Sequence, residues 1–398
     1  MTRMPHILIA GAGIGGLAAG LALLRHGFDV DLYERSAELK EVGAGLHLTP
    51  NGARVLRELG LAKAIDDVAD RPKTRVMRLW NTGEGWDIPG QDLHAEARYG
   101  APYLMMHRGD LHSILVEALR HAKPDAIHLN SECVGFTQSA RDVTLELAGG
   151  RRVVGDALIA ADGIKSVLRE RLFGPDRPHF TGAIYWRGLA PIERVPERAR
   201  TCAAGWLGPR GFITIYPVHR GELLNFNGSA RRGDWQIESW TERGTHEECL
   251  NDFAGWHEEV QEIIRNFIVP YKWGSFLRDP LKQWTVGRAT LLGDAAHSML
   301  ASLGQGGNSA IEDGLVLARC LAAYRDDVPH ALQRYEAARL ERTTRLIEAS
   351  NAQSARRLNP ALEDPVAARK YMDSLWSAPK VSEWYDWIFE YDAMRVPV

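Results

Sequence analysis

Apolar runs separated by a glycine-rich turn dominate the first 35 residues of the chain. Residues 6–10 are largely apolar and predict a buried strand, and the longer apolar run at residues 17–24 predicts a buried helix. A second short run, residues 30–33, predicts another strand, which ends at Glu34. Between the first strand and the helix lies Gly11-Ala-Gly-Ile-Gly-Gly16. The pattern therefore predicts a strand, a glycine turn, a helix and a second strand in succession.

This succession is typical of a dinucleotide-binding unit. Gly11 permits a tight turn, Gly13 lets the backbone approach a pyrophosphate, and Gly16 lets the helix pack closely on the strand. The N-terminus of the helix offers free N–H groups and a positive dipole end to phosphates. Glu34 follows the glycines by about 20 residues, at the place where a carboxylate binds ribose hydroxyls.

Two alternatives exist for the same stretch, because residues 6–24 contain no Asp, Glu, Lys or Arg. An uncharged apolar run of this length also occurs in membrane spans and signal peptides. Five glycines between Gly11 and Gly20 suit a phosphate-binding turn better than a helix that faces lipid. We therefore expect a dinucleotide site and no membrane association.

Downstream, apolar spacing predicts further strands and a region of different character. Residues 157–161 and 289–292 predict buried strands that end at Asp162-Gly163 and Gly293-Asp294. Alternation of apolar and polar residues from about 180 to 275 predicts an antiparallel sheet with a helix near 245–268. A hairpin is expected within residues 73–98. Helices are expected at residues 53–59, with Asn51 as the cap, and at 111–121, 309–324 and 330–356. The tail 357–398 is expected to be irregular up to an aromatic stretch at 384–389, which packs against the body.

Composition narrows the class of protein. The length of 398 residues suggests two domains, or one large domain with an inserted layer. The 48 basic and 51 acidic residues nearly balance, which gives no electrostatic reason to expect nucleic acid or an anionic membrane as a partner. The four cysteines are scattered without a CxxC pair, so we expect reduced thiols in a cytoplasmic protein and no metal site.

Three glycine–acid sites lie at the carboxyl ends of expected strands: the Gly11–Gly16 turn with Glu34, then Asp162-Gly163, then Gly293-Asp294. Ligands of open α/β sheets bind outside these strand ends, so the three sites can converge on one ligand. Asp294 would accept hydrogen bonds from a ribityl or ribose hydroxyl. The helix expected from Ser309 would direct its positive end at developing negative charge, such as that of a reduced flavin ring.

On these motifs the sequence resembles the single-component FAD-dependent aromatic hydroxylases, the class of para-hydroxybenzoate hydroxylase. Within that class it is most similar to the salicylate, 3-hydroxybenzoate and 6-hydroxynicotinate hydroxylases. The resemblance covers nearly the whole chain. It rests on Gly11-x-Gly13-x-x-Gly16 with Glu34, Gly43-Ala-Gly45 through Pro50-Asn51, Arg108, Asp162-Gly163-x-x-Ser166-x-x-Arg169, Trp186-Arg187-Gly188, Gly293-Asp-Ala-Ala-His297, Gly304-Gln-Gly306-x-Asn308 through Glu312-Asp313, and Tyr335-Glu336-x-x-Arg339-x-x-Arg342.

The resemblance implies an α/β fold: a Rossmann-like FAD-binding domain, an inserted antiparallel-sheet substrate domain and a C-terminal helical segment. The FAD-binding domain would comprise residues 1–72, 99–178 and 275–345. The substrate domain would comprise residues 73–98 and 179–274, and the C-terminal segment residues 346–398. A monomer or a homodimer is expected.

The implied reaction is hydroxylation of a phenolic or hydroxylated aromatic carboxylic acid through a flavin C4a-hydroperoxide. FAD would be bound tightly but not covalently, with NADH or NADPH and O₂ as co-substrates. Two alternatives stay open: another FAD-dependent redox enzyme of the same fold, such as an oxidase or dehydrogenase, and a non-enzymatic sensor that keeps the cofactor.

The resemblance also implies site residues. Asp162 and Arg169 would either contact the cofactors or form a capped turn beneath the flavin. His47 and Tyr216 are the expected catalytic residues, since a phenol reacts faster as its phenolate and needs a base or hydrogen-bond relay. Arg187, Tyr216, His47 and Cys202 are expected at the substrate, with Arg231 and Arg232 as weaker candidates for pairing a carboxylate. Cofactor contacts are expected from Gly11, Gly13, Ile14, Gly15, Gly16, Glu34, Arg35, Ala44, Gly45, Arg108, Asp162, Arg169, Asp294, Gly304, Gly306, Gly307 and Asn308.

One position departs from the family pattern. Relatives often carry a proline in the loop between His297 and Gly304, and here Ala301 takes the corresponding place. The backbone carbonyl and N–H groups of the loop remain, so attachment of oxygen to the ring is still expected to work. Without the proline ring, we expect a less rigid pocket wall at this point.

Overall fold

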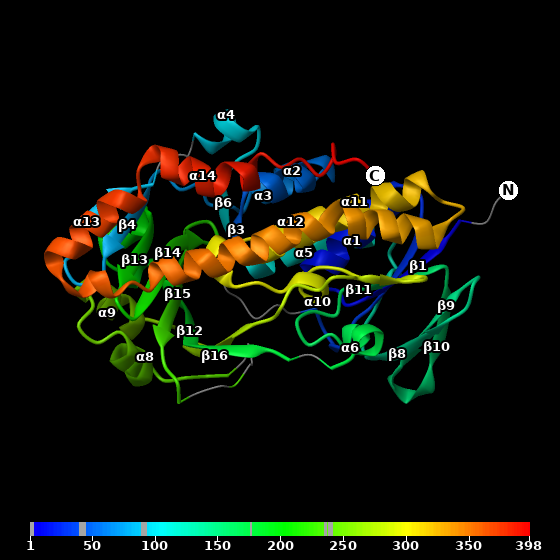
Figure 1. The fold of residues 1–398 in the computed structure, drawn as a ribbon, viewed down its shortest axis with the longest axis horizontal. Helices are drawn as coiled ribbons and strands as arrows, with labels where there is room; N and C mark the ends of the chain where they lie inside the picture. The colour runs from blue at the N-terminus through cyan, green and yellow to red at the C-terminus, as the bar shows by residue number, and fades with distance from the viewer. Residues whose placement is uncertain (1–3, 40–44, 89–93, 176, 235–236, 238–241) are drawn as a thin grey trace.

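The computed structural model describes residues 4–39, 45–88, 94–175, 177–234, 237 and 242–398 (Figure 1). Its first main sheet has six strands in the order β17-β18-β11-β1-β2-β7. All neighbours are parallel except β17 and β18, which form an antiparallel pair at one edge. The strands are β1 (His6–Ala10), β2 (Asp29–Tyr33), β7 (Ile127–His128), β11 (Ala157–Ala160), β17 (Thr285–Val286) and β18 (Ala289–Leu291).

The glycine turn links β1 to helix α1 (Ile14–Arg25) as the sequence predicts. Gly11 has a positive φ of 101°, and a Cβ there would overlap the carbonyl oxygen of Ala161. A Cβ at Gly16 would overlap the carbonyl oxygen of Gly11. Helix α1 packs between α5 (Arg108–Ala122) and α11 (Gly306–Ala323), and all of these bury apolar side chains in one core with β1. Close packing of helix on strand therefore depends on both glycines.

A second sheet has seven strands in the order β16-β12-β15-β14-β13-β4-β5. The expected hairpin at its edge is present: β4 and β5 pair antiparallel, while β4 also joins the sheet by parallel pairing with β13. The strands are β4 (Arg75–Leu79), β5 (Gly85–Asp87), β12 (His179–Pro191), β13 (Ala203–Gly208), β14 (Gly211–Val218), β15 (Leu223–Arg231) and β16 (Tyr271–Leu277).

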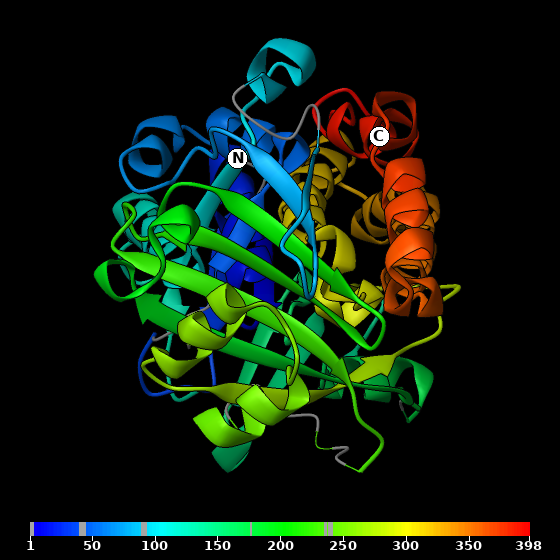
Figure 2. The same ribbon diagram turned by 90° about the vertical axis from the view of Figure 1, so that its left-hand side faces the viewer.

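Two short helices cover one face of this sheet, in front of the strands in Figure 2. They are α8 (His246–Asp252) and α9 (Glu258–Arg265), so the single helix expected near 245–268 is wrong in its extent. The chain turns between them at Gly255, which has a positive φ of 78°. A continuous helix is disfavoured there, because that backbone conformation lies outside the right-handed helical region.

The C-terminal segment contains three helices, and the irregular tail expected from the sequence is wrong. Helix α12 (Val328–Arg357) runs along the length of the molecule and passes both sheets (Figure 1). Helix α13 (Pro365–Leu375) begins with Asp364, whose carboxylate accepts hydrogen bonds from the N–H groups of the first turn. Helix α14 (Ala378–Phe389) buries Tyr385 and Phe389 in the core beneath the second sheet, so the aromatic stretch does pack against the body.

Smaller elements complete the chain. Asn51 does not cap the helix that follows it: α2 begins at Pro50, after Thr49, and the Asn51 side chain turns inward.

None of the described helices has the length and apolar character needed to cross a membrane. The remaining elements are α2 (Pro50–Glu58), α3 (Ala62–Asp66), α4 (Ala95–Tyr99), α6 (Val167–Phe173), α7 (Glu197–Arg200), α10 (Asp294–His297), a two-stranded sheet of β3 (Gly45–Leu48) and β6 (Leu104–His107), and a three-stranded sheet of β8 (Cys133–Gln138), β9 (Val143–Leu147) and β10 (Arg152–Gly155).

Candidate active site

A cavity of about 180 Å³ lies between the glycine loop at residues 304–307 and the inner face of the second sheet. Strand β3 and residues 299–303 form one wall, and side chains of β12, β14 and β15 form the opposite wall. Helices α12 and α14 close one end with Arg357, Tyr385 and Phe389. The cavity therefore draws its lining from the second sheet, from the two-stranded sheet and the loop on the opposite side, and from the C-terminal helices.

The first glycine turn leaves room for a ligand beside the first sheet. Nothing lies within 4 Å of a Cβ placed at Gly13, so the backbone is open there. The Glu34 carboxylate accepts hydrogen bonds from the N–H groups of Ala12 at 3.0 Å and Ser36 at 2.9 Å. Burial opposes ionisation of Glu34, but these N–H groups outweigh it and lower its pKa. Glu34 is thus an ionised carboxylate next to an open turn, and Arg35 beside it is exposed.

Asp162 and Arg169 form a partly buried turn that contacts the backbone beside the third acidic site, Gly293-Asp294. The Asp162 carboxylate accepts hydrogen bonds from Oγ of Ser166 at 2.5 Å and from the N–H of Leu168 at 3.2 Å. Burial raises the pKa of Asp162 despite these bonds. The Arg169 guanidinium donates to the carbonyl oxygens of Ile164 at 2.8 Å and Ala295 at 3.2 Å. This arrangement favours the capped-turn interpretation over direct cofactor contact.

Asp294 and the glycine loop line the cavity from the side of the first sheet. Asp294 is exposed, whereas its neighbours in α10 are buried. Gly306 and Gly307 lie in the first turn of α11. This first turn contains no acidic residue, and no side chain caps it. The free N–H groups of such a helix start favour negative charge in the cavity.

Asn308 fastens strand β3 to this loop. Its Nδ2 donates to the carbonyl oxygens of His47 and Gly304, each at 2.8 Å, and its Oδ1 accepts from the N–H of Thr49 at 3.0 Å. A Cβ at Gly45 would lie 2.6 Å from the Tyr216 ring, so the strand approaches the second sheet closely at that point. Ala44, also expected in the cofactor site, lies outside the described residues.

His47 lies at the centre of the cavity's polar groups. Its ring meets the Tyr216 ring edge-on, with centroids 4.4 Å apart. Nδ1 of His47 is 2.5 Å from the Tyr103 hydroxyl, and Arg75 donates to that hydroxyl from 2.6 Å. Tyr103 and Arg75 were not among the residues expected at the site. Tyr103 is 56 residues and Arg75 is 28 residues from His47 along the chain, and their local sequence gives no sign of this contact.

The Arg75 contact favours one arrangement of protons along this chain. A guanidinium can only donate, so the Tyr103 oxygen accepts from Arg75 and its own proton is available to Nδ1 of His47. In this arrangement Nε2 is the protonated nitrogen of the neutral ring. Burial lowers the pKa of His47 well below its usual value, and the charges of Arg75 and Arg357 act in the same direction. His47 is therefore neutral, and with Tyr103 donating to Nδ1 it offers a hydrogen-bond donor at Nε2.

The remaining substrate candidates divide into two groups. Arg187 lines the cavity with its guanidinium over the Trp273 ring, 4.5 Å from the centroid. Cys202 does not line it: the thiol packs in the core on the other face of the sheet, 3.9 Å from Arg78, so its expected place at the substrate is wrong. Alternation of side chains across a strand accounts for this, because Cys202 precedes β13 and its core neighbours are Trp206 and the outer helices.

Arg231 and Arg232 are also remote from the cavity. Arg231 is exposed at the end of β15 and lines a groove on the outer face with Trp80. Arg232 pairs with Asp234 at 2.8 Å and Asp252 at 3.3 Å. Two further residues line the cavity: Arg108 at the start of α5, and Ala301, at the loop position that relatives often fill with proline.

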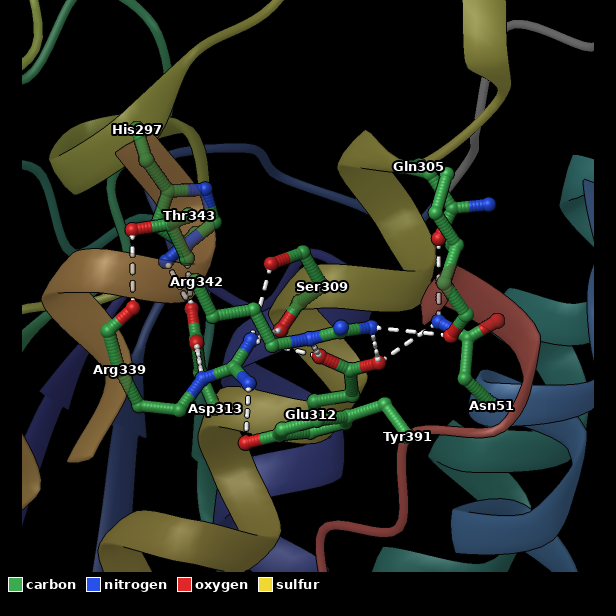
Figure 3. Close-up of polar contacts among 12 residues, drawn as sticks. Asn51, His297, Gln305, Ser309, Glu312, Asp313, Arg339, Arg342, Thr343 and Tyr391 are labelled. Atoms are coloured by element: carbon green, nitrogen blue, oxygen red, sulfur yellow. Dashed lines mark hydrogen bonds and ion pairs between the residues drawn. The ribbon is translucent and has the colours of Figure 1, made fainter. Parts of the chain in front are cut away.

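A buried network of charges lies behind the glycine loop and joins α11 to α12 (Figure 3). Asp313 accepts hydrogen bonds from Nε2 of His297 at 2.6 Å and Nε of Arg339 at 2.7 Å. Glu312 pairs with Arg339 and Arg342, each at 2.8 Å. Both carboxylates are fully buried, and each is matched by at least one guanidinium, so the charges compensate one another inside the protein.

The network reaches the cavity at two points. Asp313 Oδ2 accepts from the N–H of Gly293, the residue before Asp294, at 3.1 Å. Glu312 Oε1 accepts from Nδ2 of Asn51 at 2.6 Å, which holds α2 and the strand before it. The network thus fixes both backbone segments that present cofactor-side groups.

Comparisons with known proteins agree with this site. Residues 4–350 match the family model described as FAD binding domain. The chain belongs to this FAD-binding family. It is 36% identical over 398 residues to 3-amino-4-hydroxybenzoate 2-monooxygenase PtnB3 of Streptomyces platensis, covering 99% of this chain and 98% of the relative. It is 34% identical over 407 residues to 6-hydroxynicotinate 3-monooxygenase of Pseudomonas fluorescens, covering 100% and 98%.

Solved structures give the same result. A Klebsiella pneumoniae HpxO structure complexed with FAD and uric acid aligns with a TM-score of 0.83 at 25% identity, covering 100% of this chain and 98% of that chain. A salicylate hydroxylase substrate complex aligns with a TM-score of 0.80 at 25% identity, covering 99% and 97%. The resemblance inferred from the motifs is confirmed, and the protein is an FAD-dependent monooxygenase of the aromatic hydroxylase class that uses NAD(P)H.

Proposed function

We propose that this monooxygenase hydroxylates a hydroxylated aromatic carboxylic acid of the size of benzoate or nicotinate. The observation that carries the proposal is the cavity itself, where a neutral His47 meets Tyr216 and where four arginines share the lining with aromatic, apolar and a few polar side chains. Asp294, on the cofactor side, is the only carboxylate among the described residues that line the cavity. The relatives named for hydroxybenzoate and hydroxynicotinate act on compounds that carry both a ring hydroxyl and a carboxylate.

The residues present fit FAD. The open turn at Gly13 and the Glu34 carboxylate suit an adenosine diphosphate moiety, and the exposed Asp294 suits a ribityl chain. Gly304, Gly306 and Gly307 offer backbone without side chains where a flat ring would lie. Bound FAD would carry electrons from NAD(P)H and activate O₂, while the protein supplies orientation and electrostatics.

On the substrate side, His47 and Tyr216 would hold the ring hydroxyl. The Nε2–H of His47 donates to the substrate oxygen and stabilises its ionised form, which is the more reactive form toward an electrophilic oxygen. Arg75 acts through Tyr103 to keep His47 in this tautomer. The apolar lining from β14 and α14 excludes water from the reacting ring.

A substrate screen tests the proposal. Purified holoenzyme is mixed with salicylate, 3-hydroxybenzoate, 3-amino-4-hydroxybenzoate or 6-hydroxynicotinate, and NADH and NADPH oxidation is followed together with oxygen uptake and product analysis. We expect at least one acid to stimulate oxidation and yield a hydroxylated ring. Stimulation by none, or stimulation with hydrogen peroxide as the sole product for all, would overturn the proposal.

We also propose the domain division stated from the sequence, and a cytoplasmic protein that is a monomer or a homodimer. The two main sheets draw their strands from the segments assigned to the two domains, apart from the end of β16 (Tyr271–Leu277), which crosses the boundary between residues 274 and 275. All four cysteines are free thiols, which suits a reducing compartment. Limited proteolysis, sedimentation analysis and cell fractionation test these three points.

A further inference from the structure

Arg357 occupies an unusual position at the end of the cavity. It is the last residue of α12, lines the cavity and is only 6% exposed. Its guanidinium lies over the Phe212 ring, 4.7 Å from the centroid. The Tyr385 hydroxyl forms a hydrogen bond with the guanidinium. The Nε of Arg357 has no hydrogen-bond partner, and no carboxylate within the described parts of the chain forms an ion pair with this side chain. A buried cation with unused donors is costly unless an anion joins it.

The contrast with the rest of α12 makes this absence informative. Arg339 and Arg342 of the same helix are also buried, and each pairs with a carboxylate of α11 at 2.8 Å. Burial lowers the pKa of Arg357, and the neighbouring Arg75 adds to the effect, yet a guanidinium remains protonated at physiological pH. The fold thus supplies acids for two buried arginines of α12 and leaves the third facing the cavity.

Two other cavity arginines are already engaged. Arg75 donates to the Tyr103 hydroxyl, and Arg187 lies over Trp273 and is partly exposed. Contact with the Phe212 ring and the hydrogen bond with Tyr385 hold the Arg357 guanidinium in place, and its Nε remains available to a carboxylate. Arg357 and His47 both line this small cavity, so both can contact one small substrate.

We propose that Arg357 binds the carboxylate of the aromatic substrate and selects for acids over neutral aromatic compounds. The inference rests on the proposed function and adds its specificity-determining residue. With the carboxylate at Arg357, the ring spans the cavity toward His47 and Tyr216, where the hydroxyl would lie. The substrate completes an ion pair that the chain leaves open.

The test is a binding measurement without turnover. Oxidised holoenzyme is titrated with salicylate, 3-hydroxybenzoate and 6-hydroxynicotinate and with their carboxamides, and binding is read from the change in the flavin absorption spectrum. The variants are Arg357→Met, Arg357→Lys and Arg187→Met. Arg356→Met is the matched control, because Arg356 is adjacent but lies over Trp384, away from the cavity.

We expect Arg357→Met to weaken binding of the acids by roughly 10- to 100-fold, which corresponds to the free energy of hydrogen bonds to a charged group. The affinity for the carboxamides should stay within about threefold of the wild-type affinity. Arg357→Lys should retain part of the preference, since it keeps the charge without the planar fork. Arg356→Met should behave like the wild type. If Arg357→Met fails to retain flavin, Arg357→Lys carries the comparison.

Three results would overturn the inference while the proposed function stands: equal losses for acids and carboxamides, no loss for either, or the selective loss appearing in Arg187→Met instead. Failure of every acid to bind or be hydroxylated by the wild type would count against the proposed function and the inference together. Hydroxylation of an acid by wild type and Arg357→Met with the same KM would refute the inference alone.

Discussion

Replacing Asp313 by asparagine tests whether the buried network stabilises the site. Asp313 accepts three hydrogen bonds, from Gly293, His297 and Arg339, at 3.1, 2.6 and 2.7 Å. Asparagine keeps the shape but removes the negative charge, and its amide group offers a single accepting oxygen. At least one of the three donors then loses its partner in a fully buried position.

The expected loss follows from the partners that remain. Removing one member of a buried ion pair costs about 3–5 kcal/mol. Arg339 keeps its pair with Glu312 at 2.8 Å, so we expect the lower part of that range, about 3 kcal/mol in the free energy of unfolding. Because the Gly293 N–H bonds to this carboxylate and Gly293 directly precedes Asp294, the variant should also hold FAD less tightly.

The pH dependence gives a second signature of the same charge. Burial opposes ionisation of Asp313, but His297 and Arg339 outweigh it and lower its pKa from 3.8 to about 2. A carboxyl whose pKa is lower in the folded state stabilises the fold above the pKa of the unfolded state. That stabilisation is lost as the pH falls from about 4 toward 2. The difference between wild type and Asp313→Asn should therefore be constant from neutral pH to about pH 5 and shrink below it.

Urea unfolding of the holoenzyme, followed by circular dichroism and flavin fluorescence, measures both effects. Asp326→Asn is the control, because it makes the same chemical change at an exposed position between α11 and α12. A decrease of less than about 1 kcal/mol in the free energy of unfolding of Asp313→Asn would show that the buried charge of Asp313 does not stabilise the fold. An equal decrease in the control would show the same.

Further predictions concern the cavity and the cofactor turn. His47→Ala and Tyr216→Phe should reduce hydroxylation by about 10²-fold or more while FAD content stays at the wild-type level, since both lie on the substrate side; equal loss of flavin would show a structural role. Tyr103→Phe should lower kcat and destabilise the fold by about 1–3 kcal/mol, because Arg75 and His47 each lose a partner; unchanged kcat in stopped-flow assays would remove Tyr103 from the relay. Glu34→Gln should weaken FAD binding in reconstitution titrations of apoprotein by about tenfold, and unaltered affinity would contradict its assignment to the ribose.

Much of the cofactor side was predictable because its signals are local in sequence. The turn from Gly11 to Gly16 combines strand, glycine and helix patterns within a few residues, and its conformation matches the structure. The strand ends at Asp162 and Asp294 follow from short apolar runs. Parallel pairing of β11 with both β1 and β18 brings these strand ends to one edge of the sheet, as expected.

The substrate side was less predictable because its contacts join distant residues. Arg357 looks like any charged residue of a long amphipathic helix until the fold places it behind Phe212. Tyr103 and Arg75 have no motif, and Cys202 was assigned to the wrong face because strand register is not visible in the sequence. Asn51 resembles a helix cap, but tertiary contact with Glu312 overrides that local preference.

The most direct test of the central claim is the origin of the oxygen in the product. Holoenzyme, NAD(P)H and the acid that gives the strongest stimulation are incubated under O₂ enriched in the heavy isotope, and the product is analysed by mass spectrometry. The account predicts a ring-hydroxylated product that carries one oxygen atom from O₂. A product without isotopic label, or consumption of NAD(P)H and O₂ with an unchanged aromatic ring for every acid, would contradict it.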